Sequence, residues 1–212
     1  MLFQDRRHAG ELLAEKLDNY RNQQPLILAV PRGGVIIAEP VWLRLGGELD
    51  LIITRKIGAP NQPELAIGAV TGDGFTLLND KIISRLNVQE QYIKKTAEKE
   101  QSEIIRRLED YRGKQPLPPV DERLIILVDD GVATGYTLLS ALRSLQEKKP
   151  TRLILAVPIG PPDTLSMLDR EVDELVYVQA PADFAAVGQF YQNFDQVSDR
   201  EVKVVLQKAG KI

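Results

Sequence analysis

The spacing of hydrophobic residues changes repeatedly along the chain, and these changes predict its secondary structure. Short, unbroken apolar runs such as residues 26–30 and 124–128 are typical of strands buried on both faces of a parallel sheet. Between such runs, apolar residues recur three or four positions apart, which indicates amphipathic helices. Strands that alternate with helices predict an α/β fold with a doubly wound, mostly parallel sheet. Its strands are expected at residues 26–30, 49–54, 124–128, 152–157 and 174–179.

Helices and one antiparallel β-hairpin complete the predicted fold. Residues 66–70 and 75–78 flank the sequence Thr71-Gly72-Asp73-Gly74, a turn signal that favours a hairpin. Residues 80–112 are rich in charge but keep one apolar stripe, which predicts a single long helix with a solvated face. Ser198 and Glu201 have the spacing of a capping box, which predicts the start of the last helix. The other helices are expected at residues 5–20, 35–45 and 135–149, with a short one from residue 163.

Composition and charge exclude several classes of function. The chain has 212 residues, a number typical of one domain, with 27 Lys and Arg against 30 Asp and Glu. This mixed charge gives no reason to expect nucleic acid as a partner, and no apolar run approaches the ~20 residues of a membrane span. The absence of cysteine excludes disulfides, thiolate metal ligands and a cysteine nucleophile, and it suits a cytoplasmic protein. A single histidine disfavours a His-based triad or zinc site.

The most informative segment follows the apolar run 124–128, where Asp129 and Asp130 precede a loop that leads into a helix. Ligands of open α/β sheets lie beyond the carboxyl ends of the strands. Backbone N–H groups, hydroxyls and a helix N-terminus suit a phosphate, whereas two carboxylates suit vicinal hydroxyls or a water bound to magnesium. The combination predicts a ribose 5-phosphate site, and the alternative is a helix cap with an ordinary tight loop. The loop residues are Gly131, Val132, Ala133, Thr134, Gly135, Tyr136 and Thr137.

This loop matches neither of the two common nucleotide-binding motifs. No Gly-Lys-Ser/Thr follows, as in a Walker A loop, and the glycines are not spaced as in a dinucleotide-binding fingerprint. An apolar strand, paired acids, a small residue, Thr-Gly and a final Thr instead resemble the motif of type I phosphoribosyltransferases that binds 5-phosphoribosyl 1-pyrophosphate (PRPP). The resemblance implies that Asp129 and Asp130 hold the ribose hydroxyls and, through water, Mg²⁺, while residues 131–137 hold the 5-phosphate.

The resemblance extends over nearly the whole chain and is strongest to a bacterial group of predicted phosphoribosyltransferases. Arg32, Gly33 and Gly34 match the family's loop that binds pyrophosphate through backbone amides, often with an unusual peptide geometry. Two glycines let the backbone approach a dianion, and Arg32 adds charge-assisted contacts; the alternative is a plain strand-to-helix turn. Arg55 and Lys56 are expected at the end of the second strand, near the pyrophosphate. The implied catalytic residues are Arg55, Lys56 and Asp130.

Two further regions correspond to mobile or accessory parts of the family. Residues 57–64 correspond to a flexible lid over PRPP, with an ordinary surface loop as the alternative. The single domain, residues 1–212, is expected to have a core at about 20–179 and a small C-terminal hood at about 180–212 that includes the N-terminal helix. Phe184 and Tyr191 could stack on the base, or they could fill the core. No general base is assigned, although Glu64, Asp183 and Asp195 are conceivable.

The resemblance implies a transferase of nucleotide salvage that uses Mg²⁺ and transfers phosphoribosyl from PRPP to a nitrogenous base. Ala133 departs from hypoxanthine-guanine members, which have an acidic residue there; adenine-type members also show Ala-Thr-Gly. This departure argues against an unchanged 6-oxopurine mechanism, and the acceptor base is not identified. The alternatives are a PRPP- or nucleotide-sensing regulator with little turnover and a general phosphate-ester enzyme. Dimers are common in the family, and the apolar face of the N-terminal helix could form a homodimer.

Overall fold

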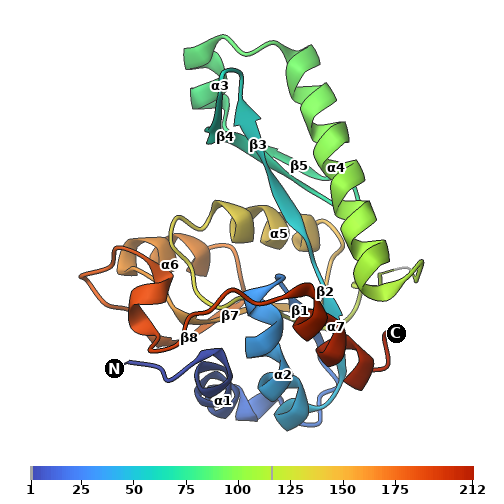
Figure 1. Ribbon diagram of the computed structural model, residues 1–212, viewed down its shortest axis with the longest axis vertical. Coiled ribbons are helices and arrows are strands. Elements are labelled where there is room, and N and C mark those ends of the chain that lie inside the picture. Colours follow the sequence, from blue (N-terminus) through green and yellow to red (C-terminus); the bar gives the residue numbers. More distant parts are fainter. Residues whose placement is uncertain (1, 116) are drawn as a thin grey trace.

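The computed structural model describes residues 2–115 and 117–212 and contains a five-stranded parallel sheet (Figure 1). The strand order is β2-β1-β6-β7-β8, so later strands lie on both sides of β1. Each neighbouring pair in this sheet runs parallel. The strands are β1 (Leu26–Ala29), β2 (Glu48–Leu51), β6 (Leu124–Val128), β7 (Arg152–Ile159) and β8 (Glu174–Gln179).

Helices cover both faces of this sheet, which confirms the predicted α/β class. Alternate residues of a strand point to opposite faces, so Ile27 and Leu28 of β1 belong to two separate hydrophobic clusters. The cluster of Ile27 includes side chains of α1, α2 and α7, and the cluster of Leu28 includes side chains of α5 and α6. The helices are α1 (Arg6–Lys16), α2 (Gly33–Leu45), α5 (Tyr136–Gln146), α6 (Pro162–Asp169) and α7 (Asp199–Lys208).

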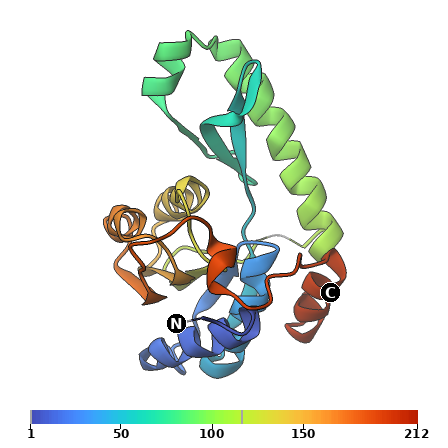
Figure 2. The same ribbon diagram turned by 60° about the vertical axis from the view of Figure 1, so that its left-hand side comes forward.

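A three-stranded antiparallel sheet and a long helix stand above the parallel sheet (Figures 1 and 2). Helices α4 and α5 both contact β3 and β4. The antiparallel pairing of β4 with β5 confirms the hairpin predicted around the Thr71-Gly72-Asp73-Gly74 turn. The elements of this part are β3 (Thr54–Ala59), β4 (Gln62–Thr71), β5 (Thr76–Leu78), α3 (Asp80–Leu86) and α4 (Glu90–Arg112).

The predicted strand over residues 49–54 is wrong at its C-terminal end. β2 ends at Leu51, and the N–H of Ile52 still donates to the carbonyl oxygen of Ala29 in β1, at 3.0 Å. From Thr54 the chain pairs with β4 in the other sheet. Ile52 and Ile53 are both buried at the transition. Hydrophobicity therefore stays constant while the hydrogen-bonding partner changes, and the apolar run does not reveal the change.

The single helix predicted over residues 80–112 is instead two helices, α3 and α4. Asn87 ends α3 in the left-handed region, with φ 48° and ψ 46°, a conformation that asparagine adopts more readily than most residues. Asn79 caps the start of α3, because its side chain accepts a hydrogen bond from the N–H of Ile82. α3 has no buried residue, whereas α4 buries Ile104 and four others. The apolar stripe that suggested one helix therefore belongs to α4.

The C-terminal segment crosses over the carboxyl ends of the strands on its way from β8 to α7 (Figure 1). It contains a short 3₁₀ helix, η2 (Val187–Phe190), and α7 begins with the predicted capping box of Ser198 and Glu201. α7 contacts both α2 and α4. The first helix is shorter than predicted, because α1 ends at Lys16 and a 3₁₀ turn, η1 (Asp18–Tyr20), follows it.

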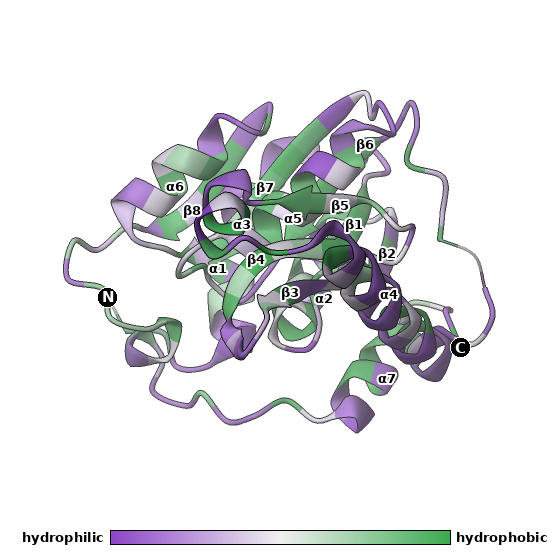
Figure 3. Ribbon diagram, turned by 90° about the horizontal axis from the view of Figure 1, so that it is seen from above, coloured by the Kyte–Doolittle hydropathy of each residue, from purple (hydrophilic) through white to green (hydrophobic). Residues whose placement is uncertain are grey.

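The hydrophobic face of α1 is buried within the chain. Ala9, Leu13 and Ala14 belong to the core, and α1 packs directly on α2. This apolar face is therefore used within the chain, and the expected homodimer stays a prediction. Seen from above, the strands of the parallel sheet are largely apolar and α4 is largely hydrophilic (Figure 3). Across the described residues, no helix combines the length and hydrophobicity that crossing a membrane requires.

Candidate active site

Two loops meet at the carboxyl ends of the adjacent strands β1 and β6. One leads into α2 through Gly33 and Gly34, and the other leads into α5 through residues 129–135. A Cβ atom added at Gly33 would lie 1.8 Å from Oδ2 of Asp130, and one added at Gly34 would lie 2.8 Å from the carbonyl oxygen of Val128. The structure thus brings the two sequence-predicted loops into direct contact, and the contact requires residues without side chains.

Asp129 and Asp130 place two carboxylates at this contact. Oδ1 of Asp129 accepts a hydrogen bond from the backbone N–H of Asp130 at 2.8 Å. Burial, and next the charge of Asp130, raises the pKa of Asp129 well above its ordinary value. Burial also raises the pKa of Asp130, although a hydrogen bond from Arg6 opposes that rise. Two adjacent and poorly solvated carboxylates therefore need a cation or a hydrogen-bond donor nearby to remain ionised.

Arg6 is the site residue that the sequence did not reveal. Its Nε donates to Oδ2 of Asp130 at 2.7 Å, and the two side chains are only 11% and 17% exposed. Arg6 stands in the first turn of α1, 124 positions from Asp130 in the chain. Its sequence context is that of an ordinary charged residue on an amphipathic helix. No local pattern could have identified it, because only the tertiary fold brings α1 to the end of β6.

The loop after Asp130 has the features of an anion site. Gly135 has φ 78° and caps α5 at its N-terminus, so the first backbone N–H groups of α5 point out of the helix there. A Cβ atom at Gly135 would lie 2.9 Å from side-chain atoms of α6, which leaves no space for another residue. Four residues of the loop are exposed, and two of them are threonines, whose hydroxyl groups suit a phosphate. The exposed residues are Ala133, Thr134, Tyr136 and Thr137.

Arg32 lies at the start of α2, on the opposite side of the contact from the aspartates. The peptide bond between Pro31 and Arg32 is cis, an unusual geometry of the kind expected for this loop. Arg32 precedes the two glycines as the N-cap of α2. Its guanidinium is 3.8 Å from a carboxylate oxygen of Asp199 in α7, and its side chain is 36% exposed. Arg32 is therefore within reach of both solvent and the site loops.

Arg55 and Lys56 do not end the second strand of the parallel sheet, contrary to the prediction. They lie inside β3, where Arg55 forms an ion pair with Glu100 of α4 and Lys56 forms one with Glu64 of β4 at 2.7 Å. Both line a cavity of about 630 Å³ between the β3–β4 hairpin and α4. None of residues 129–137 lines this cavity. In this structure, Arg55 is therefore paired with a carboxylate of α4 and Lys56 with one of β4, and neither is paired at the two site loops.

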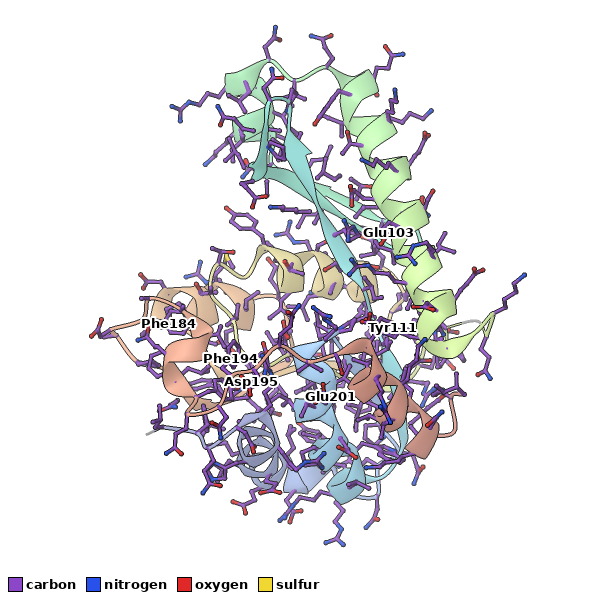
Figure 4. All side chains as sticks on the ribbon, viewed as in Figure 1. Glu103, Tyr111, Phe184, Phe194, Asp195 and Glu201 are labelled. Carbon is purple, nitrogen blue, oxygen red and sulfur yellow. The ribbon has the colours of Figure 1, made fainter. Side chains whose placement is uncertain are left out.

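The two aromatic candidates of the C-terminal segment differ in accessibility. Tyr191 is 5% exposed, its ring contacts Phe3 and Phe194, and its hydroxyl donates to the carbonyl oxygen of Asp130 at 2.6 Å. Its ring is therefore not open to a base, and the core-filling interpretation holds for Tyr191. Phe184 is half-buried and stacks on Phe190 with 5.3 Å between ring centroids. Figure 4 shows Phe184 and Phe194 on the same C-terminal segment.

Residues 57–64 are not the irregular loop that the sequence suggested. They form the end of the β3–β4 hairpin, whose turn contains Asn61 with φ 61°. Gly58 pairs with Ala66, and its carbonyl oxygen accepts a hydrogen bond from the hydroxyl of Tyr92 at 3.1 Å. This segment is therefore part of a regular hairpin, and its role as a lid stays a prediction.

The carboxylates of Asp129 and Asp130 are the candidate ligands for a divalent metal at this site. Within residues 2–115 and 117–212, no three His, Cys, Asp or Glu side chains gather as a metal cage. Mg²⁺, however, is commonly bound by one or two carboxylates together with water and substrate phosphates. Asp129 and Asp130 supply two adjacent carboxylates whose charge Arg6 partly offsets. They therefore fit a hydrated Mg²⁺ that is shared with a phosphorylated ligand.

Comparison with known sequences identifies relatives over almost the whole chain. The family model described as a phosphoribosyl transferase domain matches residues 4–193. A Mycobacterium tuberculosis protein whose name provisionally assigns phosphoribosyl transferase activity is 39% identical over 210 residues, which are 99% of this chain and 47% of that protein. The chain thus spans about half the length of the curated relatives it matches.

Comparison with solved structures shows the same fold. The Thermus thermophilus protein TT1426 is 40% identical, with a TM-score of 0.85 over 98% of this chain and 99% of that chain. A hypothetical protein from Neisseria gonorrhoeae is 14% identical, with a TM-score of 0.51 and 98% of both chains covered. The second likeness shows the fold alone.

Proposed function

The chain belongs to the phosphoribosyltransferase family, and from this premise we propose that it binds PRPP and transfers the phosphoribosyl group to a nitrogenous base. The observation that carries the proposal is one loop at the end of β6 that places two acceptor carboxylates, Asp129 and Asp130, shortly before the N-terminus of α5. A ribose 5-phosphate offers hydroxyl donors at one end and a phosphate acceptor at the other. The site is complementary to both ends at once. Nucleotide salvage is the setting that this reaction fits.

The loop residues would hold the phosphoribosyl group in place. Asp129 and Asp130 would accept hydrogen bonds from the ribose hydroxyls, and the N–H groups and hydroxyls of residues 131–137 would bind the 5-phosphate. The contacts to the 5-phosphate lie away from the reacting carbon, and their binding energy holds that carbon in position relative to the acceptor. Thr134 and Thr137 are the two exposed threonines of this loop.

The leaving pyrophosphate is highly charged, so its stabilisation should dominate catalysis. Arg32 and the backbone N–H groups of Gly33 and Gly34 would bind it from the start of α2. Arg55 and Lys56 would contribute after exchanging their carboxylate partners for the pyrophosphate. When bound, Mg²⁺ held through water by Asp129 and Asp130 would neutralise charge that develops on the leaving group.

Fewer residues can be assigned to the binding of the acceptor base than to the binding of PRPP. Phe184, half-buried on the C-terminal segment, is the remaining aromatic candidate to stack on a base. Among the three conceivable general bases, Glu64 is paired with Lys56 in the distant hairpin. Asp195 lies on the segment whose backbone contacts Arg6, at the edge of the site. We therefore leave the base unassigned and test the acceptor directly.

Calorimetric titration tests the PRPP site. We expect wild-type protein to bind PRPP with a millimolar or tighter dissociation constant and to bind it more tightly with Mg²⁺ than without. No heat of binding at millimolar PRPP in either condition would contradict the proposal. When binding is established, release of pyrophosphate in the presence of a panel of nitrogenous bases separates a transferase from the alternative, a PRPP- or nucleotide-sensing protein with little turnover.

The double variant Asp130→Asn with Thr134→Ala tests the location of the site. It removes one carboxylate and one loop hydroxyl, and we expect PRPP affinity to fall by about 100-fold or more, because two charge-assisted contacts are lost. Circular dichroism and thermal unfolding check that the fold survives. Retained affinity in a folded double variant would place the PRPP site elsewhere.

A further inference from the structure

Arg6 enters the site from the far end of the chain and is held on three sides. Its Nε donates to Oδ2 of Asp130 at 2.7 Å, and one terminal nitrogen donates to the carbonyl oxygen of Asp195 at 2.8 Å. Its guanidinium carbon lies 3.8 Å from the centroid of the Phe194 ring, a cation–π contact. Figure 4 shows Phe194 and Asp195 together on the segment that crosses the carboxyl ends of the strands. These contacts fix the direction of the guanidinium.

The backbone around Arg6 is also fixed. The N–H of Phe3 donates to the carbonyl oxygen of Phe190 at 2.8 Å. The N–H of Gln192 donates to the carbonyl oxygen of Phe3, also at 2.8 Å. Asp5 then caps α1 by accepting from the N–H of His8 at 2.9 Å, so Arg6 begins the helix. The N-terminal segment is thus hydrogen-bonded to the C-terminal segment just before Arg6 in the chain. Arg6 has little freedom to leave Asp130.

The opposite loop leaves room for this ion pair. A Cβ atom at Gly33 would lie 1.8 Å from Oδ2 of Asp130 and 2.9 Å from Nε of Arg6. Tyr191 holds the backbone of the same aspartate, because its hydroxyl donates to the carbonyl oxygen of Asp130 at 2.6 Å. Three parts of the chain, the starts of α1 and α2 and the C-terminal segment, therefore converge on one residue, Asp130.

We propose that Arg6 is a positioning residue that orients the Asp130 carboxylate toward the ribose hydroxyls and thereby makes the site select ribose over 2-deoxyribose. This inference rests on the proposed function. With Oδ2 held by Arg6, the carboxylate cannot rotate, and Oδ1 is left to accept from a hydroxyl of the ligand. Without Arg6, Asp130 would stand beside Asp129 with no cation to hold it. Its hydrogen bond to the sugar would then lose its geometry.

Arg6 is assigned to the aspartate and not to a phosphate of the ligand. Its Nε, one terminal nitrogen and one face already have partners within the chain. The loop of residues 131–137 is exposed and supplies the helix N-terminus for the phosphate. The effect of Arg6 should therefore depend on the sugar hydroxyls and not on the phosphate.

Three probes separate these contributions in one calorimetric experiment: ribose 5-phosphate, 2-deoxyribose 5-phosphate and inorganic phosphate. We expect wild-type protein to bind ribose 5-phosphate at least about tenfold more tightly than the deoxy sugar, because the deoxy sugar leaves a charged acceptor unpaired. In Arg6→Gln, this preference should fall to about twofold, while affinity for inorganic phosphate stays unchanged. Arg44→Gln is the matched control, because it breaks an exposed ion pair with Asp18 at the other end of α2.

The outcomes distinguish failure of the inference from failure of the proposed function. A preference that persists in Arg6→Gln, or an equal loss of affinity for all three probes, would overturn the positioning role. If wild-type protein binds no ribose 5-phosphate, the proposed function itself fails, and the inference fails with it. Adding Arg6→Gln to Asp130→Asn should cause no further loss of preference, since Arg6 acts through Asp130.

A second variant covers the case in which Arg6→Gln does not fold. Phe194→Leu keeps the charge of Arg6 but removes the ring on which the guanidinium lies. We expect the preference for ribose 5-phosphate to fall about threefold, in line with a partly buried cation–π contact. An unchanged preference in this variant would also overturn the inference.

Discussion

Single residues determine how closely the two site loops approach each other. At Gly33 and Gly34 the missing side chains allow α2 to begin directly against the end of β6. Their role is steric, since the space that a Cβ atom would need is filled by Asp130 and by the backbone of β6. The same space contains the Arg6 contact with Asp130. Adding one carbon atom at Gly33 should therefore lower ligand affinity more than it lowers the stability of the fold.

We predict that Gly33→Ala lowers the affinity for PRPP by at least about tenfold, or about 1.4 kcal/mol, because the new methyl group displaces the Asp130 carboxylate. Calorimetric titration measures the affinity, and thermal unfolding checks the fold. Gly72→Ala is the control: its Cβ atom would meet only side chains, the nearest at 3.1 Å, in the β4–β5 turn. Equal affinity of Gly33→Ala and wild type would mean that Asp130 does not face the ligand.

Secondary-structure elements are joined to one another by polar contacts as well as by hydrophobic packing. The β4–β5 turn docks on α5 through Asp73, which pairs with Lys148 and accepts from the hydroxyls of Thr71 and Ser144. Burial would raise the pKa of Asp73, but the Lys148 and Thr71 contacts outweigh it and hold the pKa below its ordinary value of 3.8. The charged form of Asp73 therefore stabilises the docked antiparallel sheet.

The lowered pKa of Asp73 predicts an acid-sensitive contribution to stability. The unfolded chain binds the proton more tightly than the folded chain, so this contribution is complete above pH 3.8 and is lost as pH falls through the lower, folded value. We expect Asp73→Asn to lower the free energy of unfolding by about 1 kcal/mol at pH 7, since the pair is partly exposed, and by less at pH 3. Urea unfolding at both pH values measures the difference. A gap that widens in acid would contradict the assignment.

At the scale of the whole molecule, one buried polar cluster connects the parallel sheet to the long helix. Asp50 of β2 is 1% exposed and lies 3.4 Å from Nη1 of Arg112, which is 5% exposed at the end of α4. Lys211, near the C-terminus, lies 3.6 Å from the same carboxylate. Three regions that are distant in sequence thus share one buried charge. Their unfolding should be coupled.

We predict that Asp50→Asn lowers the free energy of unfolding by about 3 kcal/mol, because it withdraws a carboxylate from buried and nearly buried cations. Denaturant unfolding followed by tryptophan fluorescence and by circular dichroism should show one shifted transition for both signals. Glu103→Gln serves as control, since Glu103 pairs with Arg106 and Arg107 on the exposed surface of α4 (Figure 4). Equal midpoints for Asp50→Asn and Glu103→Gln would show that the buried cluster does not couple the two parts.

Sequence patterns predicted best where one local cause is sufficient. The strand over residues 174–179 and the capping box at Ser198 match the structure because strand periodicity and cap geometry are set within a few residues. The break at Asn87 and the end of β2 at Leu51 were missed, because hydrophobicity does not change there. Arg55 and Lys56 were misplaced for the same reason, as they follow an apolar run that passes from one sheet into another.

The sequence by itself determined the α/β class, the loop of residues 129–137 and the glycine pair at the start of α2, because spacing and residue type carry that information locally. Only the tertiary structure decided which charges meet. Arg6 reaches Asp130 across 124 positions, Tyr191 is buried against the same aspartate, and Arg55 turns to Glu100. The physical reason is that an ion pair depends on distance in space. A sequence shows that a charge exists, and the packing of distant elements determines its partner.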